Sequence, residues 1–139
     1  MQAYGGVYFQ TQSDHNAGVY VASGSGSWAS LSDRNAKENF QAADGEALLA
    51  RLHAIPILTW NYKSQDDSIR HIGPLAQDFY AAFGVGEDDK HIATVDADGV
   101  ALAAIQALYK LSLEKDKEIE QLKREMSELH ARLEQLANR

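Results

Sequence analysis

The chain has 139 residues, a formal net charge of −7 and no cysteine. It has room for one modest core and no means of forming a disulfide framework or a thiolate metal site. Its 13 basic residues are outnumbered by 20 acidic ones, and no basic face typical of nucleic-acid binding is visible. No apolar run approaches the roughly 20 residues of a membrane span. We therefore expect neither nucleic acid nor a membrane as a partner.

Residues 1–31 have the composition of short strands. Alternating runs at 6–10 and 17–21 are separated by the turn-forming stretch 13–16, which predicts two strands joined by a loop. The Gly/Ser stretch at 24–27 predicts a flexible join. Because an isolated hairpin is marginal in water and large apolar residues are few, we expect these strands to pack against copies of themselves, as the β-rich end of a longer fibre.

Residues 32–100 predict a small α+β domain. Asp44 is a suitable N-cap, and Pro74 suits the first turn of a helix. The glycines at 84 and 86 are suited to ending that second helix. In chain order the predicted elements are a helix opening at Asp44, strands at 57–62 and 68–73, a helix following Pro74, and a short strand at 91–95.

Residues 101–139 predict a coiled-coil helix that begins near residue 100. It contains neither Pro nor Gly, and apolar residues recur at a and d positions of a heptad. Ser112 and Lys115 interrupt this seam, which indicates that the helix changes partner there. Glu118 and Lys123 at g and e positions favour a parallel arrangement, with dimer and trimer both open and a single helix lying on a core as the alternative. The predicted seam comprises Ile105, Leu108, Ile119, Leu122, Met126, Leu129, Leu133 and Leu136.

Ser32 and Lys37 are the candidate catalytic pair. A serine hydroxyl needs a base, and a lysine serves only if its pKa falls from about 10.4 toward ~7–8 through burial or a nearby cation, for which Arg34 is a candidate. Residues five apart point in different directions in a helix or a strand. The turn formers Asp33 and Asn35 allow a bend that brings the pair together, and a contact between protomers is the other route. From the residue types alone, a solvated loop is the commoner interpretation.

No cofactor or metal site is expected from the sequence. Asp96-Ala97-Asp98-Gly99 lacks the third ligand and the terminal glutamate of an EF-hand loop, and we expect it at the entry of the long helix, with Asp98 near the cap. The five histidines, His15, His53, His71, His91 and His130, show no spacing typical of metal ligands.

Three ordered blocks resemble a known family. They are Ser32-Asp33-Arg34 with Lys37-Glu38-Asn39, then Gly73-Pro74-Leu75-Ala76-Gln77-Asp78, then Asp96 to Val100 leading into Ala104-Ile105-Gln106. This pattern resembles the intramolecular chaperone domain at the C-terminus of phage endosialidases, tail spikes and tail fibres. A similar domain occurs in the myelin regulatory factor family and in bacterial fibre proteins. The resemblance covers residues 32–139.

The resemblance implies a single-turnover serine endopeptidase that cuts its own chain between Leu31 and Ser32. Ser32 would be the nucleophile and Lys37 its general base. His71 matches a histidine implicated in the family, and a packed strand histidine is an equally good interpretation. Asp33 either orients the pair or simply shapes the bend.

The implied function is an intramolecular chaperone of a fibre or spike. Three copies of the chain would associate through the coiled coil, align the upstream β-rich region of the same chain, and release the chaperone fragment after cleavage. The mature fibre would then sit on a virion tail or at a cell surface. A permanent trimeric cap that never cleaves and a membrane-tethered transcription factor of the myelin regulatory type are the alternatives.

Overall fold

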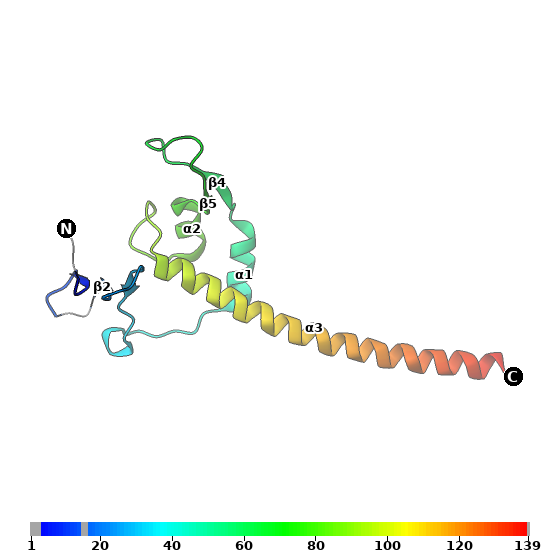
Figure 1. The fold of residues 1–139 in the computed structure, drawn as a ribbon. Helices are drawn as coiled ribbons and strands as arrows, with labels where there is room; N and C mark the ends of the chain where they lie inside the picture. Colours follow the sequence, from blue (N-terminus) through cyan, green and yellow to red (C-terminus); the bar gives the residue numbers. More distant parts are fainter. Residues whose placement is uncertain (1–3, 15–16, 139) are drawn as a thin grey trace. The chain divides into compact units, whose positions relative to one another are not determined.

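The computed structural model describes residues 4–14 and 17–138. The predicted turn at 13–16 extends into His15 and Asn16, and the predicted final helix ends at Arg139; these three residues lie outside the described ones. The chain divides into two compact units, Met1–Ala42 and Ala43–Arg139 (Figure 1). The predicted α+β class is confirmed, because small antiparallel sheets accompany a long C-terminal helix.

The first unit is a three-stranded antiparallel sheet in the order β1-β2-β3. The predicted pair of strands is confirmed as β1 (Val7–Gln10) and β2 (Gly18–Val21), with Tyr8 opposite Tyr20. A third strand, β3 (Ala29–Ser30), was not predicted. The Gly/Ser stretch predicted as a flexible join therefore connects two paired strands. None of the described residues in this unit is buried, as expected from its few large apolar side chains.

The second unit begins with α1 (Gly45–Ala54). The carboxylate of Asp44 accepts a hydrogen bond from the backbone N–H of Ala47 at 3.1 Å, which confirms the predicted N-cap. The antiparallel strands β4 (Leu58–Trp60) and β5 (His71–Gly73) follow. They confirm the strands predicted at 57–62 and 68–73, although each observed strand has only three residues.

Two further helices complete this unit. Helix α2 (Ala76–Phe83) ends at Gly84, whose φ of 63° is the left-handed conformation that glycine adopts readily. The predicted strand at 91–95 is wrong, because α3 (Thr94–Ala137) already begins there. Asp98 consequently lies inside the helix rather than at its cap, which is Ala93. Asp96 occupies the first turn, where a negative charge stabilises the helix dipole.

The core of the second unit is small and lies where α1 packs against α2 and against the first part of α3 (Figure 1). Its buried apolar residues are Phe79, Val100, Ala104 and Ala107. Helix α1 approaches α3 closely at Gly45, where an added Cβ would lie 2.8 Å from the Cβ of Ala107. The first part of α3 thus packs on its own domain through one face, as expected.

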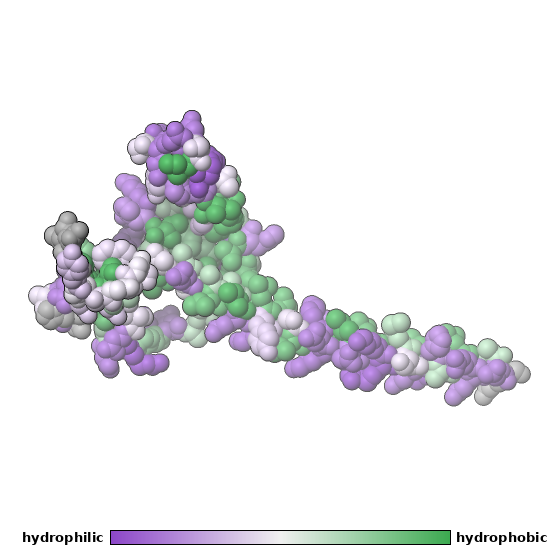
Figure 2. Space-filling view, viewed as in Figure 1, coloured by the Kyte–Doolittle hydropathy of each residue, from purple (hydrophilic) through white to green (hydrophobic). Residues whose placement is uncertain are grey.

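The face of α3 that points away from α1, and the whole second half of α3, are exposed to solvent in the single chain. All residues from 108 to 138 are exposed, and Figure 2 shows hydrophobic side chains recurring along this helix between hydrophilic ones. Within the described part of the chain, no helix is both apolar and long enough to span a bilayer. The eight predicted seam residues all lie in α3, and their exposed fractions range from 47% to 69%.

Candidate active site

Ser32 and Lys37 lie within hydrogen-bonding distance in the first unit. The Nζ of Lys37 donates to the Oγ of Ser32 at 2.7 Å. Both side chains are exposed to solvent in the single chain. The structure therefore supplies the nucleophile–base contact that the catalytic hypothesis requires, while catalysis by this pair stays a prediction.

A single turn of 3₁₀ helix creates the contact. This turn, η1 (Arg34–Ala36), reverses the chain between the two side chains, and the backbone N–H of Lys37 closes it by donating to the carbonyl of Arg34 at 3.2 Å. Such a turn brings residues together that a regular helix or strand would keep apart.

Asp33 shapes this bend. Its carboxylate caps η1 by accepting from the backbone N–H of Asn35 at 3.0 Å, and it also accepts from the side-chain Nδ2 of Asn35 at 3.1 Å. Asp33 is thus engaged with the turn, which corresponds to the second of its two predicted roles. A catalytic role for Asp33 remains a prediction.

Arg34, predicted as a cation beside Lys37, lies against an aromatic ring. Its guanidinium carbon is 5.5 Å from the centroid of Phe40, a distance typical of a cation–π contact. Asn39, next to this ring, has a φ of 56°, which is uncommon outside glycine but tolerated by asparagine. The Arg34–Phe40 contact and the conformation of Asn39 together fix the backbone path of residues 38–40.

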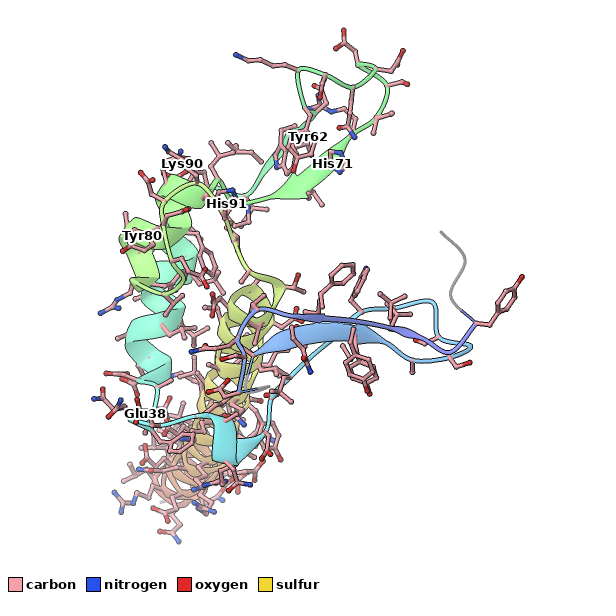
Figure 3. All side chains as sticks on the ribbon, turned by 90° about the vertical axis from the view of Figure 1, so that its left-hand side faces the viewer. Glu38, Tyr62, His71, Tyr80, Lys90 and His91 are labelled. Carbon is pink, nitrogen blue, oxygen red and sulfur yellow. The ribbon has the colours of Figure 1, made fainter. Side chains whose placement is uncertain are left out.

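His71 belongs to an aromatic cluster of the second unit. Its ring centroid lies 4.8 Å from that of Trp60 and 5.5 Å from that of Tyr62; Figure 3 shows Tyr62 and His71 together on the β4–β5 hairpin. Its Nε2 is 3.0 Å from the Oε1 of Gln65. The surroundings match the packed strand histidine of the sequence analysis, and a catalytic role for His71 remains a prediction.

Leu31, the other residue of the predicted cleavage site, is tied to the sheet. Its backbone N–H donates to the carbonyl of Gly18 at 3.1 Å, which continues the β2–β3 pairing by one residue. Neither Gly18 nor Gln65 was identified from the sequence as part of a site. A glycine inside a strand indicates that another backbone approaches closely, so the contact at Gly18 could have been predicted from the sequence. No pattern around Gln65 indicates its contact with His71.

The described residues contain no cluster of three or more histidines, cysteines and carboxylates arranged to hold a metal ion. The bend itself brings together a hydroxyl and an amine beside a peptide bond.

Comparison with known proteins identifies this segment. A family model described as the chaperone of endosialidase, Peptidase S74, matches residues 32–85. The match begins at Ser32 and contains Lys37 and His71. No curated protein matches the chain. Residues 32–85 therefore match an endosialidase-type chaperone domain.

Proposed function

We propose that this chain is an intramolecular chaperone that trimerises through α3 and then cuts itself between Leu31 and Ser32. The observation that carries the proposal is the 2.7 Å contact between Lys37 Nζ and Ser32 Oγ, located at the first residues of the segment matched by the chaperone family. The family supports a chaperone role, and the contact supports the cleavage step.

The proposed reaction needs only groups of this chain and water. With Lys37 as the neutral amine, its Nζ accepts the hydroxyl proton while Ser32 Oγ bonds to the carbonyl carbon of Leu31. The bond from that carbon to the nitrogen of Ser32 then breaks, and Lys37 returns the proton to this leaving nitrogen. The resulting ester between Leu31 and the Ser32 hydroxyl is hydrolysed by water, giving a carboxylate on Leu31 and a free amine and hydroxyl on Ser32.

The exposure of the pair supports cleavage after assembly rather than before it. A lysine acts as a base only in its neutral form, and cover by protein favours that form over the charged one. Ser32 and Lys37 are both exposed in the single chain. We expect neighbouring copies to cover Lys37 in the trimer, so that cleavage follows correct association.

Two features of the second unit support association. Among the residues that the structure describes, only four apolar ones are buried, which is a small core for a unit of this length. In addition, the eight seam residues of α3 present an apolar stripe, and soluble proteins seldom leave such a stripe uncovered. A coiled coil of parallel helices would cover it.

The proposed role follows from joining cleavage to assembly. Three helices held together raise the local concentration of the three upstream segments and reduce the entropic cost of aligning their strands. Once the chaperone fragment leaves, the upstream fibre has lost its nucleating helix, so that its unfolding becomes effectively irreversible. The upstream fibre or spike of the same chain is the proposed partner, and a virion tail or cell surface the proposed location.

Intact mass spectrometry after prolonged incubation tests the proposal. We expect the wild-type chain to separate into residues 1–31 and 32–139, and Ser32→Ala to remain whole. Ser64→Ala, which changes a serine in the β4–β5 loop, is the matched control and should separate like the wild type. Wild-type chains that remain whole as stable trimers would refute cleavage and leave a permanent trimeric cap as the function.

A further inference from the structure

Leu31, the residue before the proposed cleavage point, is held by the N-terminal sheet. Strands β2 and β3 pair with Val19 opposite Ser30 and Tyr20 opposite Ala29. The hydrogen bond from Leu31 N–H to the carbonyl of Gly18, at 3.1 Å, extends this pairing to Leu31. The proposed scissile bond thus lies at the junction between a paired strand and the η1 turn.

Gly18 supplies the accepting carbonyl from a position that admits no side chain. Its φ of +151° lies in a region that residues with a Cβ rarely adopt. An added Cβ would overlap the carbonyl oxygen of Phe9 in the neighbouring strand and lie 3.1 Å from the Cα of Gln10. The carbonyl that holds Leu31 is therefore available only while this position is a glycine packed against β1.

Leu31 also lines a surface pocket together with residues of the same hairpin. A surface pocket between β1 and β2 is lined by residues 8–10 and 17–20, and Leu31 forms part of its wall. The aromatic side chains of this hairpin are ordered by stacking, with the rings of Tyr8 and Tyr20 5.0 Å apart and nearly parallel. Leu31 therefore meets the β1–β2 hairpin through its backbone hydrogen bond and as part of the wall of this pocket.

From this arrangement we propose that the β1–β2 hairpin is the substrate-holding part of the self-cleaving site, with Gly18 as its positioning residue. This inference rests on the proposed function, because it assigns a role within that cleavage. The sheet fixes the carbonyl side of the bond while η1 fixes the attacking hydroxyl on the other side. A displacement of about 1 Å between reacting groups can cost roughly 10²-fold in rate. Cleavage then requires that the upstream sheet has folded.

The first test compares cleavage rates of the full chain. We expect Gly18→Ala to cleave at least about 10²-fold more slowly than the wild type. Gly26→Ala is the matched control, since a Cβ at Gly26 meets open space, and it should cleave at the wild-type rate. The pH at which the residual rate of Gly18→Ala is half-maximal should equal that of the wild type, because the Ser32–Lys37 contact is unchanged. A shifted pH dependence would instead mean that the substitution disturbs the pair itself, and would overturn a positioning role.

A second variant removes the hydrogen bond alone. Replacing Leu31 with its α-hydroxy acid turns the Ser30–Leu31 amide into an ester, which deletes the N–H donor and keeps the leucine side chain and the scissile bond. We expect this chain also to cleave more slowly than the wild type, by at least tenfold. An unchanged rate would overturn the inference even if Gly18→Ala had failed to fold.

Hydrogen exchange separates this inference from the proposed function. In a Ser32→Ala background, the amide of Leu31 should exchange slowly, and adding Gly18→Ala should make that exchange fast. If the wild type cleaves and Gly18→Ala cleaves equally fast, the inference fails and the proposed function stands. If the wild type never cleaves, the proposed function fails, and the positioning role fails with it even where the Leu31 amide is protected.

Discussion

The exposed seam of α3 makes a quantitative prediction about assembly. Leu129 occupies a d position and is 58% exposed in the single chain. Fully burying a leucine side chain contributes about 1.5–3 kcal/mol, so covering the exposed fraction contributes about 1–2 kcal/mol per chain. Three chains would together gain about 3–5 kcal/mol at this one layer of the proposed trimer. Because about 1.4 kcal/mol corresponds to a factor of ten, Leu129→Ala should lower the trimer association constant by roughly 10²- to 10⁴-fold.

Sedimentation equilibrium over a series of protein concentrations measures this change. The matched control is Leu113→Ala, which makes the same substitution on the same helix. Leu113 is 43% exposed, but it lies at a b position, away from the seam, and its loss should leave the association constant nearly unchanged. Cleavage is followed in the same samples by intact mass. If cleavage follows assembly, its rate for Leu129→Ala should fall with the trimer fraction and recover at high protein concentration.

Two results would refute this reasoning. Equal weakening by Leu129→Ala and Leu113→Ala would mean that helix stability, rather than a seam, controls association. A Leu129→Ala chain that remains monomeric yet cleaves at the wild-type rate would show that the Ser32–Lys37 contact of the single chain suffices, and that assembly contributes nothing to the reaction.

Three further predictions concern single positions. Lys37→Arg should slow cleavage by about 10²- to 10⁴-fold without altering the trimer, because a guanidinium does not release its proton; intact mass and sedimentation report the two effects. Gly45→Ala should lower the free energy of unfolding by about 1–3 kcal/mol, because its Cβ would crowd α3. Gly99→Ala should instead raise the free energy of unfolding by up to about 1 kcal/mol, because its Cβ meets open space and alanine favours the helix. Denaturant midpoints of the two variants that move in the same direction would contradict this. A hydrogen bond from the backbone N–H of Lys90 is the largest cause that holds the pKa of Asp88 below its usual range. Its stabilising effect is therefore present above the unfolded pKa and is lost as pH falls through the folded one, so the difference in melting temperature between the wild type and Asp88→Asn should shrink on acidification.

Local signals predicted most of the elements of the fold. Asp44 marks the start of α1 because a carboxylate can cap the free N–H groups of the first turn. Gly84 marks the end of α2 because it adopts a left-handed conformation at little cost. Residues 91–95 misled the prediction because β-branched Thr94 and Val95 are typical of strands. Packing of the following residues on α1 overrides that local preference and extends α3 to Thr94.

The candidate site was only partly accessible to sequence reasoning. The spacing of Ser32 and Lys37 and the turn formers between them allowed a bend, but the 2.7 Å contact depends on the 3₁₀ geometry of η1. The pairing of Leu31 with Gly18 joins residues far apart in sequence. Such pairing is set by the register of the whole sheet and not by any local pattern. Strand β3 has only two residues, which is too short for an alternation of apolar and polar side chains to be recognised.

The location of the proposed cut explains how the chain can divide without losing structure. In the described part of the chain, the backbone hydrogen bonds of β3 and Leu31 are made to β2, upstream of the cut. The bonds that build η1 are made among residues 33 to 37, downstream of it. Breaking the peptide bond between Leu31 and Ser32 therefore costs neither fragment a bond of its own sheet or turn. What the upstream fragment loses is its attachment to α3, and with it the high local concentration of the other chains during refolding. A released fibre should accordingly unfold no faster than its uncleaved form but refold far less efficiently, a difference that paired unfolding and refolding rates would measure.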